Sequence, residues 1–167
     1  MTPAHAPSPG EEFWKFSLDF YARPGVEAAC LALQDQHGRD VNIMLYLCWL
    51  GLSARGRIDG DGLARAEETM APWRRAAIEP LRAARRGLDP AERDGVAALY
   101  EAAKAIELVA ERMGQQQLGA LAPPPAPRAA DRRAADAAAN LTLYLGDTAA
   151  RQAAAQLFAA LGRPVEG

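Results

Sequence analysis

Cysteine and histidine are scarce in this sequence, with two of each among 167 residues. Cys30 and Cys48 lie in separate apolar segments, and neither belongs to a Cys-x-x-Cys motif or has a histidine at ligand spacing. This pattern argues against a disulfide and a zinc site, and it favours reduced, buried thiols. The glycines near 56–62 lack the lysine and threonine of a phosphate-binding loop. We therefore expect no metal ion and no other cofactor.

The sequence also lacks a long hydrophobic run. Its longest uncharged apolar stretch, from Val41 to Ala54, has 14 residues, whereas a membrane-spanning helix needs about 20. A formal net charge of −2 provides no overall basic field for nucleic acid or anionic lipid. The first residues lack the pattern of a secretory signal. We expect a cytoplasmic protein that binds neither a membrane nor nucleic acid, and the composition leaves its oligomeric state open.

No stretch alternates apolar and polar residues for long enough to be a strand, and alanine, leucine, arginine and glutamate dominate. We therefore predict an all-α fold, a compact helical bundle of about five core helices followed by a C-terminal helical hairpin. The predicted parts are a disordered lead at 1–10, a helical core at 11–118, a proline-rich linker at 119–129 and a hairpin at 130–163 that packs on the core.

Capping signals mark the first three predicted helices. Ser8 and Glu11 form a capping box for the first helix, whose inward face is aromatic. Gly38 suits the end of the second helix, and Asp40 suits the N-cap of the third, a role worth about 1 kcal/mol. The third helix, within 41–54, is apolar nearly all round, so we expect other helices to surround it.

The later helices are predicted from apolar stripes and proline positions. In a fourth helical region over about 63–86, Pro72 and Pro80 should break or kink the helix. The last helices are weakly hydrophobic and should dock loosely on the core or serve as an attachment surface. The stripes expected to face inward are Trp73, Ala77, Leu81, Ala84 and Leu88 in the fourth region, and Val96, Leu99, Ala103, Ile106, Ala110 and Met113 in the fifth helix.

A polar cluster at 34–42 separates two of the most apolar segments. His37 and Asp40 have local explanations, because one lies in a last helical turn and the other caps the next helix. Asp35 faces the unfavourable end of a helix dipole, so it should pair with a basic side chain. A buried amide at Asn42 would also need partners. The predicted buried network consists of Gln34, Asp35, Asn42 and one arginine from Arg82, Arg85 and Arg86.

Two interpretations of this cluster remain open. In the first, the network is structural and fixes how three helices meet. In the second, it lines a ligand pocket with an aromatic wall. A partly open cavity around Asp35 would favour the second interpretation, and a filled junction the first. The pocket would combine Asp35, His37, Asn42 and Arg82 with Trp14, Tyr21, Trp49 and Trp73.

Catalytic and metal-binding alternatives have weaker support in the sequence. Asp35 and His37 are two residues apart and point to different helix faces, which argues against a catalytic pair. A metal set of His37 with Asp35 or Asp40 would lack a third nearby ligand. The segment RIDGDGLARAEE resembles a calcium loop, but Arg57 and Arg65 occupy ligand positions and would repel the ion. We therefore predict no catalytic residue and no metal ligand.

Three segments resemble a known family, namely FWKFSLDFY, PGVEAACLALQDQHGRDVNIMLYLCWLG and WRRAAIEPLRAARRGL. They are similar to the bacterial domain-of-unknown-function 2390 family over roughly residues 13–118, and CLALQD-x-x-G-x-DVN is the most specific string. The resemblance implies a small helical bacterial protein and brings no assigned activity.

Two classes of function follow from these patterns. The first is a non-enzymatic protein-interaction or regulatory module, and the absence of acid–base pairs at catalytic spacing favours it. Its partner would bind the aromatic first helix or a basic face formed by Arg74, Arg75, Arg82, Arg85 and Arg86. The second is a small-molecule-binding protein or enzyme with a pocket around Asp35, Asn42 and an arginine of the 74–86 segment.

Overall fold

The computed structural model describes residues 6–89 and 95–162, and all regular structure in those ranges is helical. The all-α prediction is confirmed. None of the described helices is long and apolar enough to cross a membrane. The elements are α1 (Pro9–Tyr21), α2 (Val26–His37), α3 (Val41–Leu52), α4 (Gly60–Trp73), the π-helical segment η1 (Arg74–Ile78), α5 (Glu79–Arg86), α6 (Val96–Ala120), α7 (Ala130–Leu145), α8 (Thr148–Ala153) and α9 (Ala155–Leu161).

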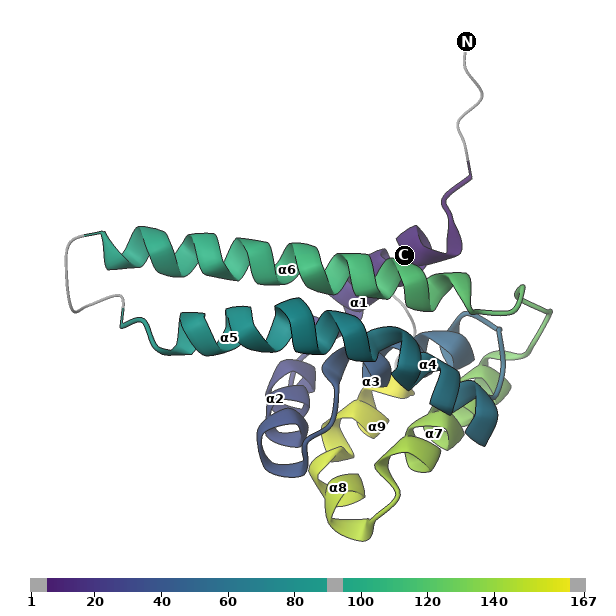
Figure 1. Ribbon diagram of the computed structural model, residues 1–167. Coiled ribbons are helices and arrows are strands. Elements are labelled where there is room, and N and C mark those ends of the chain that lie inside the picture. Colours follow the sequence, from purple (N-terminus) through teal and green to yellow (C-terminus); the bar gives the residue numbers. More distant parts are fainter. Residues whose placement is uncertain (1–5, 90–94, 163–167) are drawn as a thin grey trace.

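Helix α3 lies at the centre of the molecule (Figure 1). Its residues from Asn42 to Gly51 are all buried, because α1, α2, α4, α6 and α7 pack around it. Each fully buried aliphatic or aromatic side chain there contributes about 1.5–3 kcal/mol of transfer free energy. Phe13 of α1 stacks on Trp49 with ring centroids 5.2 Å apart, which fixes α1 against this core.

The predicted capping residues act as expected. The backbone N–H of Ser8 donates to the Glu11 carboxylate at 2.7 Å, and the Glu11 N–H donates to the Ser8 hydroxyl. Gly38 ends α2 in the left-handed region at φ 62°, and the Asp40 carboxylate accepts the Asn42 N–H at 2.8 Å. Helix α1 begins at Pro9, inside the expected lead; residues 1–5 of that lead lie outside the described residues.

The helical rod from α4 to α5 continues through both prolines, so they do not break it, but it is not a regular α-helix between them. Between Pro72 and Pro80 the backbone widens into η1, and the N–H of Glu79 donates to the carbonyl of Arg74, five residues earlier. A π turn inserts one extra residue, so the side chains beyond it rotate relative to a regular helix. As a result, Ala84 of the predicted inward stripe is exposed, and arginines of α5 point toward α6.

Helix α6 runs beside α5 and leaves much of its predicted stripe in solvent. Leu99, Ile106 and Met113 are exposed, whereas Ala110 is buried, so the expected inward face of this helix is wrong at three of its six positions. The contacting face instead carries the polar residue Glu107, because arginines of α5 lie opposite it. Figure 1 shows α6 along one edge of the molecule, with α5 beside it and α1 behind.

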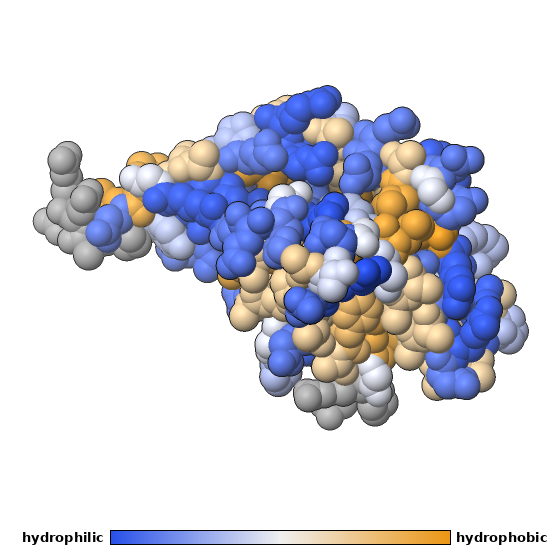
Figure 2. Space-filling view, turned by 90° about the horizontal axis from the view of Figure 1, so that it is seen from below, coloured by the Kyte–Doolittle hydropathy of each residue, from blue (hydrophilic) through white to orange (hydrophobic). Residues whose placement is uncertain are grey.

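The C-terminal helices pack tightly, although loose docking was expected from their weak hydrophobicity. Gly51 of α3 lacks a side chain where α7 approaches, and a Cβ placed on it would overlap the backbone nitrogen and Cα of Ala137. Asn140 of α7 donates to the carbonyl of Gly56 and accepts the Ile58 N–H, which ties the turn before α4 to α7. Small residues allow backbones to approach closely, so a low apolar content does not imply weak packing. Figure 2 views this underside, where pale, weakly hydrophobic residues lie between hydrophilic margins.

Candidate ligand cleft

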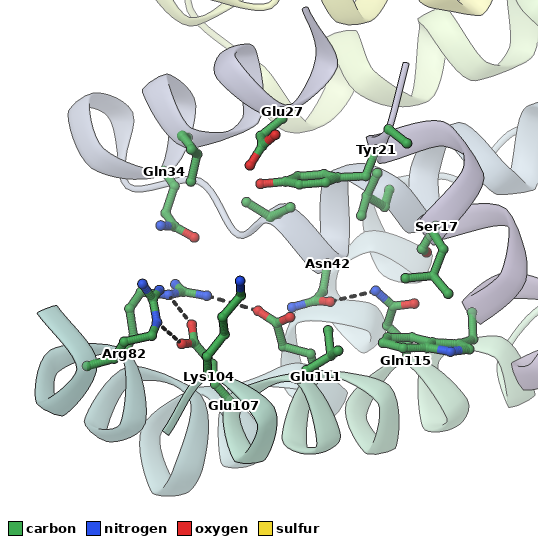
Figure 3. Close-up of a pocket in the computed structure, with 18 of the residues that line it drawn as sticks. Ser17, Tyr21, Glu27, Gln34, Asn42, Arg82, Lys104, Glu107, Glu111 and Gln115 are labelled. Atoms are coloured by element: carbon green, nitrogen blue, oxygen red, sulfur yellow. Dashed lines mark hydrogen bonds and ion pairs between the residues drawn. The ribbon is translucent and has the colours of Figure 1, made fainter. Parts of the chain in front are cut away.

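A partly open cleft of about 580 Å³ lies between α1, α2, α3, α5 and α6. Its walls combine aliphatic and aromatic side chains with a group of polar ones that come from different helices (Figure 3). The polar lining residues are Ser17, Glu27, Gln34, Asn42, Arg82, Arg85, Arg86, Lys104, Glu107, Glu111 and Gln115, and the apolar and aromatic ones include Trp14, Leu18, Tyr21, Leu31, Val41, Leu45, Tyr100 and Leu108.

An ion cluster between α5 and α6 forms one wall of the cleft. Glu107 accepts from Arg82 Nε and from Arg85 Nε, each at 2.8 Å, and Arg82 Nη2 also donates to Glu111 at 3.0 Å. Burial alone would raise the pKa of Glu107, but hydrogen bonds from Arg85 and Arg82 outweigh burial and hold that pKa below its ordinary value. The Glu107 carboxylate is therefore ionised and fixes the two guanidinium groups in place.

Glu111 lies next to this cluster in a different environment. Burial raises the pKa of its carboxyl to about 7, and the attraction of Arg82 offsets only part of that effect. Glu111 and Glu107 are one helical turn apart, yet Glu107 has two arginine partners and Glu111 has one. The cleft thus contains a carboxyl that can gain or lose a proton near neutral pH.

Replacing Glu111 by glutamine is expected to stabilise the protein more at high pH than at low pH. Because the folded-state pKa is raised to about 7 from 4.5, stability present below pH 4.5 is lost as the pH rises through 7. Glutamine cannot ionise, and its carbonyl still accepts from Arg82. Urea unfolding of both proteins at about pH 5 and about pH 8 measures the difference in unfolding free energy. An equal difference at both pH values would contradict the assignment.

A pair of buried amides forms the inner wall. Gln115 Nε2 donates to Asn42 Oδ1 at 2.7 Å, joining α6 to α3. The Oε1 atom of Gln115 and the Oγ atom of Ser17 are buried and make no hydrogen bond within the described part of the chain. In Figure 3 the Gln115 amide lies between Asn42 and Ser17. Leaving such atoms without a partner costs about 1–3 kcal/mol each, so this wall has unused hydrogen-bonding capacity.

Two aromatic residues of α1 complete the cleft. Burial is the main cause that raises the pKa of the Tyr21 hydroxyl above its ordinary value, so this group stays protonated and can donate. Its ring extends over the space between α2 and α6 (Figure 3). The Trp14 ring contacts Arg112, whose guanidinium carbon lies 5.8 Å from the ring centroid. Tyr21 therefore offers the cleft a hydroxyl group, and the rings of Tyr21 and Trp14 offer it flat apolar surfaces.

Asp35 lies outside the cleft, so the single buried network predicted from the sequence does not form. It pairs with Arg86 at 2.8 Å, but the side chains are 48% and 50% exposed. Leu33 points inward from α2 and is fully buried, and residues two apart on a helix face different directions. Among the described residues Gln34 makes a single long side-chain hydrogen bond, of 3.4 Å, to Asp35, and Asn42 is bonded to α6 instead.

The other predicted site residues divide between the cleft and the rest of the fold. Arg82, Arg85, Trp14 and Tyr21 line the cleft with Gln34 and Asn42. His37 ends α2 and is not among the lining residues. Trp49 is buried beneath the Arg55 guanidinium, 4.5 Å from its ring, and Trp73 is half-buried against the core, so neither forms the expected aromatic wall.

The arginines of the 74–86 segment do not form one basic face. Arg74 pairs with the cap carboxylate of Asp40 at 3.0 Å, Arg82 and Arg85 turn toward α6, and Arg86 bonds to α2. Arg75 is exposed and makes no ion pair among the described residues. Carboxylates of the same chain thus form ion pairs with most of the arginines that were expected to contact a partner protein.

The polar residues of α6 were missed in the sequence. Glu107, Glu111 and Gln115 recur every four residues, which places them along one side of a helix. On the helix they lie beside the apolar stripe from Val96 to Met113, from which the inward face of this segment was predicted. A polar row at this spacing, opposite an arginine-rich helix, is the signal that could have identified them.

A comparison with known protein families finds a match that includes the residues of the cleft. Residues 12–118 match the family described as protein of unknown function (DUF2390). The chain belongs to the DUF2390 family. All the residues that line the cleft fall within the matched range, whereas α7, α8 and α9 lie beyond it. Comparisons with curated proteins and with solved structures give no match.

The chemistry available in the DUF2390 cleft is hydrogen bonding and ion pairing. Within 6–89 and 95–162 no group of three or more histidine, cysteine, aspartate or glutamate residues could hold a metal ion. Neither cysteine lines the cleft, and burial raises the pKa of both the Cys30 and Cys48 thiols. The arrangement can bind a molecule through Gln115, Glu111 and Tyr21 while its apolar part contacts the leucines.

Proposed function

We propose that this DUF2390 protein reversibly binds a small organic molecule in the cleft between α1, α2, α3, α5 and α6. The observation that carries the proposal is an inner wall with buried, unpartnered polar atoms, Ser17 Oγ and Gln115 Oε1, in a cleft with apolar sides. A few convergent polar groups within a largely apolar concavity are typical of small-molecule sites. Of the two functions expected from the sequence, this arrangement favours the small-molecule one.

The size of the cleft supports a compact ligand. Its volume of about 580 Å³ lies within the range of about 300–1,000 Å³ that is usual for sites of drug-sized molecules. Leu18, Leu31 and Leu108 line it and are each about half exposed, so a bound apolar group would remove their surface from water. Burying such surface stabilises a complex by about 25 cal/mol for each square ångström.

The charges support a ligand without large net charge. Arginines and glutamates of α5 and α6 already neutralise one another across the cleft wall. Lys104 and Glu27 line opposite sides, and neither makes an ion pair among the described residues (Figure 3). A zwitterion could satisfy both, and an uncharged heterocycle could donate to Gln115 and Glu111. A strongly anionic or cationic molecule would meet like charge on one side.

The groups present support binding rather than covalent catalysis. A covalent mechanism needs an activated nucleophile with a base at hydrogen-bond distance. Ser17 lines the cleft, but its hydroxyl makes no hydrogen bond to a histidine or carboxylate among the described residues. Glu111 can exchange a proton near neutral pH, which would couple ligand affinity to pH.

The experiment fills the cleft by substitution. Leu108→Trp places a large ring in the cleft from an exposed position on α6, and Leu143→Trp makes the same change at a matched exposed site on α7, outside the cleft. Uncharged and zwitterionic heteroaromatic fragments are screened against all three proteins by saturation-transfer NMR. We expect fragments to bind the wild type and Leu143→Trp with Kd values of about 0.1–1 mM, and to bind Leu108→Trp at least about tenfold more weakly.

Circular dichroism melting of each variant checks that the fold is retained. Equal binding to all three folded proteins would place the fragments elsewhere and contradict the cleft assignment. A complete lack of binding to the wild type across the library would contradict the proposed function itself.

A further inference from the structure

A second cavity, of about 450 Å³, lies where the turn before α4 and the first turns of α4 meet the segment that follows α6. None of the residues that line it also lines the cleft. Among the described residues, three arginines line this cavity, Arg55, Arg57 and Arg65, but only one carboxylate, Asp59. Figure 1 shows the start of α4 and the end of α6 at the same end of the molecule. The cavity is therefore a separate candidate site with positive charge.

Two of the lining arginines differ in how far their guanidinium groups are already bonded. Arg55 is 7% exposed, and its Nη2 and Nη1 atoms donate to the Glu12 carboxylate and to the carbonyl of Pro123, each at 2.6 Å. Arg65 lies in the second turn of α4 and is exposed. Within the part of the chain that the structure describes, Arg65 makes no ion pair, although Asp61 lies one turn earlier on the same helix. The cavity thus combines one fixed guanidinium group with one that can bond a ligand.

Carboxylates around the cavity offset only part of the positive charge. Arg57 Nε donates to Asp136 at 3.0 Å, and this buried carboxylate also pairs with Arg128 and Arg132, at 3.3 and 3.4 Å. The Asp59 carboxylate caps α4, where it accepts a backbone N–H at 2.8 Å. The charged lining residues and their ion-pair partners comprise five arginines and three carboxylates, namely Arg55, Arg57, Arg65, Arg128, Arg132, Glu12, Asp59 and Asp136. A surplus of two positive charges remains, and it favours an anionic ligand.

The hydroxyl of Tyr46 supplies an unused donor at the same cavity. Tyr46 is 2% exposed, and its ring packs against Phe13 and Trp49, with centroids 5.5 and 6.0 Å away. Its hydroxyl makes no hydrogen bond within 6–89 and 95–162, and it is not closed off from solvent. Burial raises the pKa of this hydroxyl to about 12, while the nearby charges of Arg55 and Arg65 act to lower it. The group therefore stays protonated and can donate to an anion beside these arginines.

We propose that this cavity binds the phosphate group of a small organic phosphate monoester, which accepts hydrogen bonds from Tyr46 and Arg65 beside the charge of Arg55. Near pH 7 a phosphate monoester carries a charge of about −1.5 to −2, so it matches the surplus of two positive charges more closely than a carboxylate does. Its oxygens accept several hydrogen bonds at once, and the planar guanidinium group of arginine suits them.

The remaining wall favours an organic phosphate over inorganic phosphate. Ile58, Leu121 and Pro123 line it, and Leu121 is 43% exposed. An aromatic or aliphatic group attached to the phosphate would cover this apolar surface and remove it from water. The volume of about 450 Å³ accommodates such a molecule, because sites for drug-sized ligands usually measure about 300–1,000 Å³.

Titration of the full chain with phenyl phosphate, followed by isothermal calorimetry, tests the site. We expect the wild type to bind with a Kd of about 0.1–1 mM, and Arg65→Gln to bind about tenfold more weakly. Arg75→Gln removes the same charge from an exposed arginine of η1 that lines neither cavity, so it should bind like the wild type. A wild type that binds no phenyl phosphate at about 10 mM would overturn the proposal, as would equal weakening in the two variants.

Tyr46→Phe isolates the contribution of the hydroxyl. The variant keeps the ring against Phe13 and Trp49, and we expect it to bind phenyl phosphate about three- to tenfold more weakly than the wild type. Because the hydroxyl has no protein partner to lose among the described residues, thermal melting should show unchanged stability. Unchanged affinity in a folded Tyr46→Phe protein would overturn the role of this hydroxyl.

Two further probes test the chemical class of the ligand. Inorganic phosphate lacks the apolar group, and benzoate replaces the phosphate by a carboxylate on the same ring. We expect each to bind the wild type at least about fivefold more weakly than phenyl phosphate. Equal affinity for benzoate would overturn the preference for phosphate, and equal affinity for inorganic phosphate would overturn the role of the apolar wall.

The phosphate site and the cleft can fail separately, because they share no lining residue. Arg65→Gln should leave the binding of heteroaromatic fragments in the cleft unchanged, and Leu108→Trp should leave the Kd for phenyl phosphate unchanged. The cleft also contains arginines, so Leu108→Trp is the decisive control. If this variant weakened phenyl phosphate binding and Arg65→Gln did not, the phosphate would bind in the cleft and the assignment to the second cavity would be wrong.

Discussion

Gly51→Ala is expected to lower the free energy of unfolding by about 2–3 kcal/mol, although alanine is the better helix former. The added methyl group would overlap backbone atoms of Ala137, which cannot rotate away as a flexible side chain would. Helices α3 and α7 would have to separate, and the hydrogen bonds of Asn140 to the turn after α3 would lengthen. The prediction therefore tests whether the C-terminal helices are part of the core.

Gly60→Ala is the matched control. Gly60 begins α4, and a Cβ placed there has no neighbour within 4 Å. This substitution should leave stability unchanged or raise it by up to about 1 kcal/mol through reduced chain entropy. Urea unfolding monitored by circular dichroism measures both variants. Equal effects of the two substitutions would show that α7 does not pack on α3 as the structure has it.

Glu107→Gln is expected to destabilise the protein by about 2–4 kcal/mol at neutral pH. The substitution removes the carboxylate that accepts from Arg82 and Arg85 and leaves two partly buried guanidinium groups without their full partner. Because the folded-state pKa of Glu107 is lowered, its contribution is present above the ordinary value of 4.5 and is lost as the pH falls through the lower, folded-state pKa.

Asp35→Asn removes the carboxylate of an arginine–carboxylate pair that is exposed at the surface. Asp35 and Glu107 both accept from an arginine at 2.8 Å, but Asp35 is 48% exposed and Glu107 is 8% exposed. We expect no measurable change in stability for Asp35→Asn, because solvent screens an exposed pair. Chemical unfolding at pH 7 and at about pH 3.5 measures the free energy of unfolding of Asp35→Asn and of Glu107→Gln. A larger loss for Asp35→Asn than for Glu107→Gln would mean that the polar cluster at 34–42, rather than the α5–α6 wall, is the buried junction.

Local patterns predicted much of the fold. The run IMLYLCWL has no polar face, so it could be placed at the centre of a helical bundle from the sequence alone. The caps at Ser8, Gly38 and Asp40 act within five residues of themselves, and the structure contains them as predicted. Interactions of this kind depend on nearby residues only, which is why they can be read from one sequence.

The errors arose where one element changes the direction of another. A regular helix through Pro72 and Pro80 would point Ala84 inward, but the extra residue of η1 rotates the following turns and exposes it. Arg82 and Arg85 of α5 point toward α6, where Glu107 pairs with both. Because Glu107 faces α5, its neighbour Ile106 faces solvent. A periodicity measured along a single helix contains no information about such a rotation.

The candidate site was partly predictable for a similar reason. The structure confirms that Asn42 is buried and that its amide is hydrogen-bonded. Its partner, Gln115, is 73 residues away in the sequence and was not predicted. Asp35 was expected to pair with an arginine of the fourth region, and it does so at the surface. Positions along the chain do not specify which polar groups meet in space. The cleft could therefore be located only from the way α1, α2, α3, α5 and α6 pack together.

The site at which a small molecule contacts the protein can be mapped by NMR. In ¹H–¹⁵N spectra, a heteroaromatic fragment that binds the wild type should shift the side-chain amides of Gln115 and Asn42 and the indole N–H of Trp14, which all line the cleft. The indole N–H of Trp73, outside the cleft, should remain unchanged. Shifts at Trp73 without shifts at Gln115 and Asn42 would contradict the proposed site.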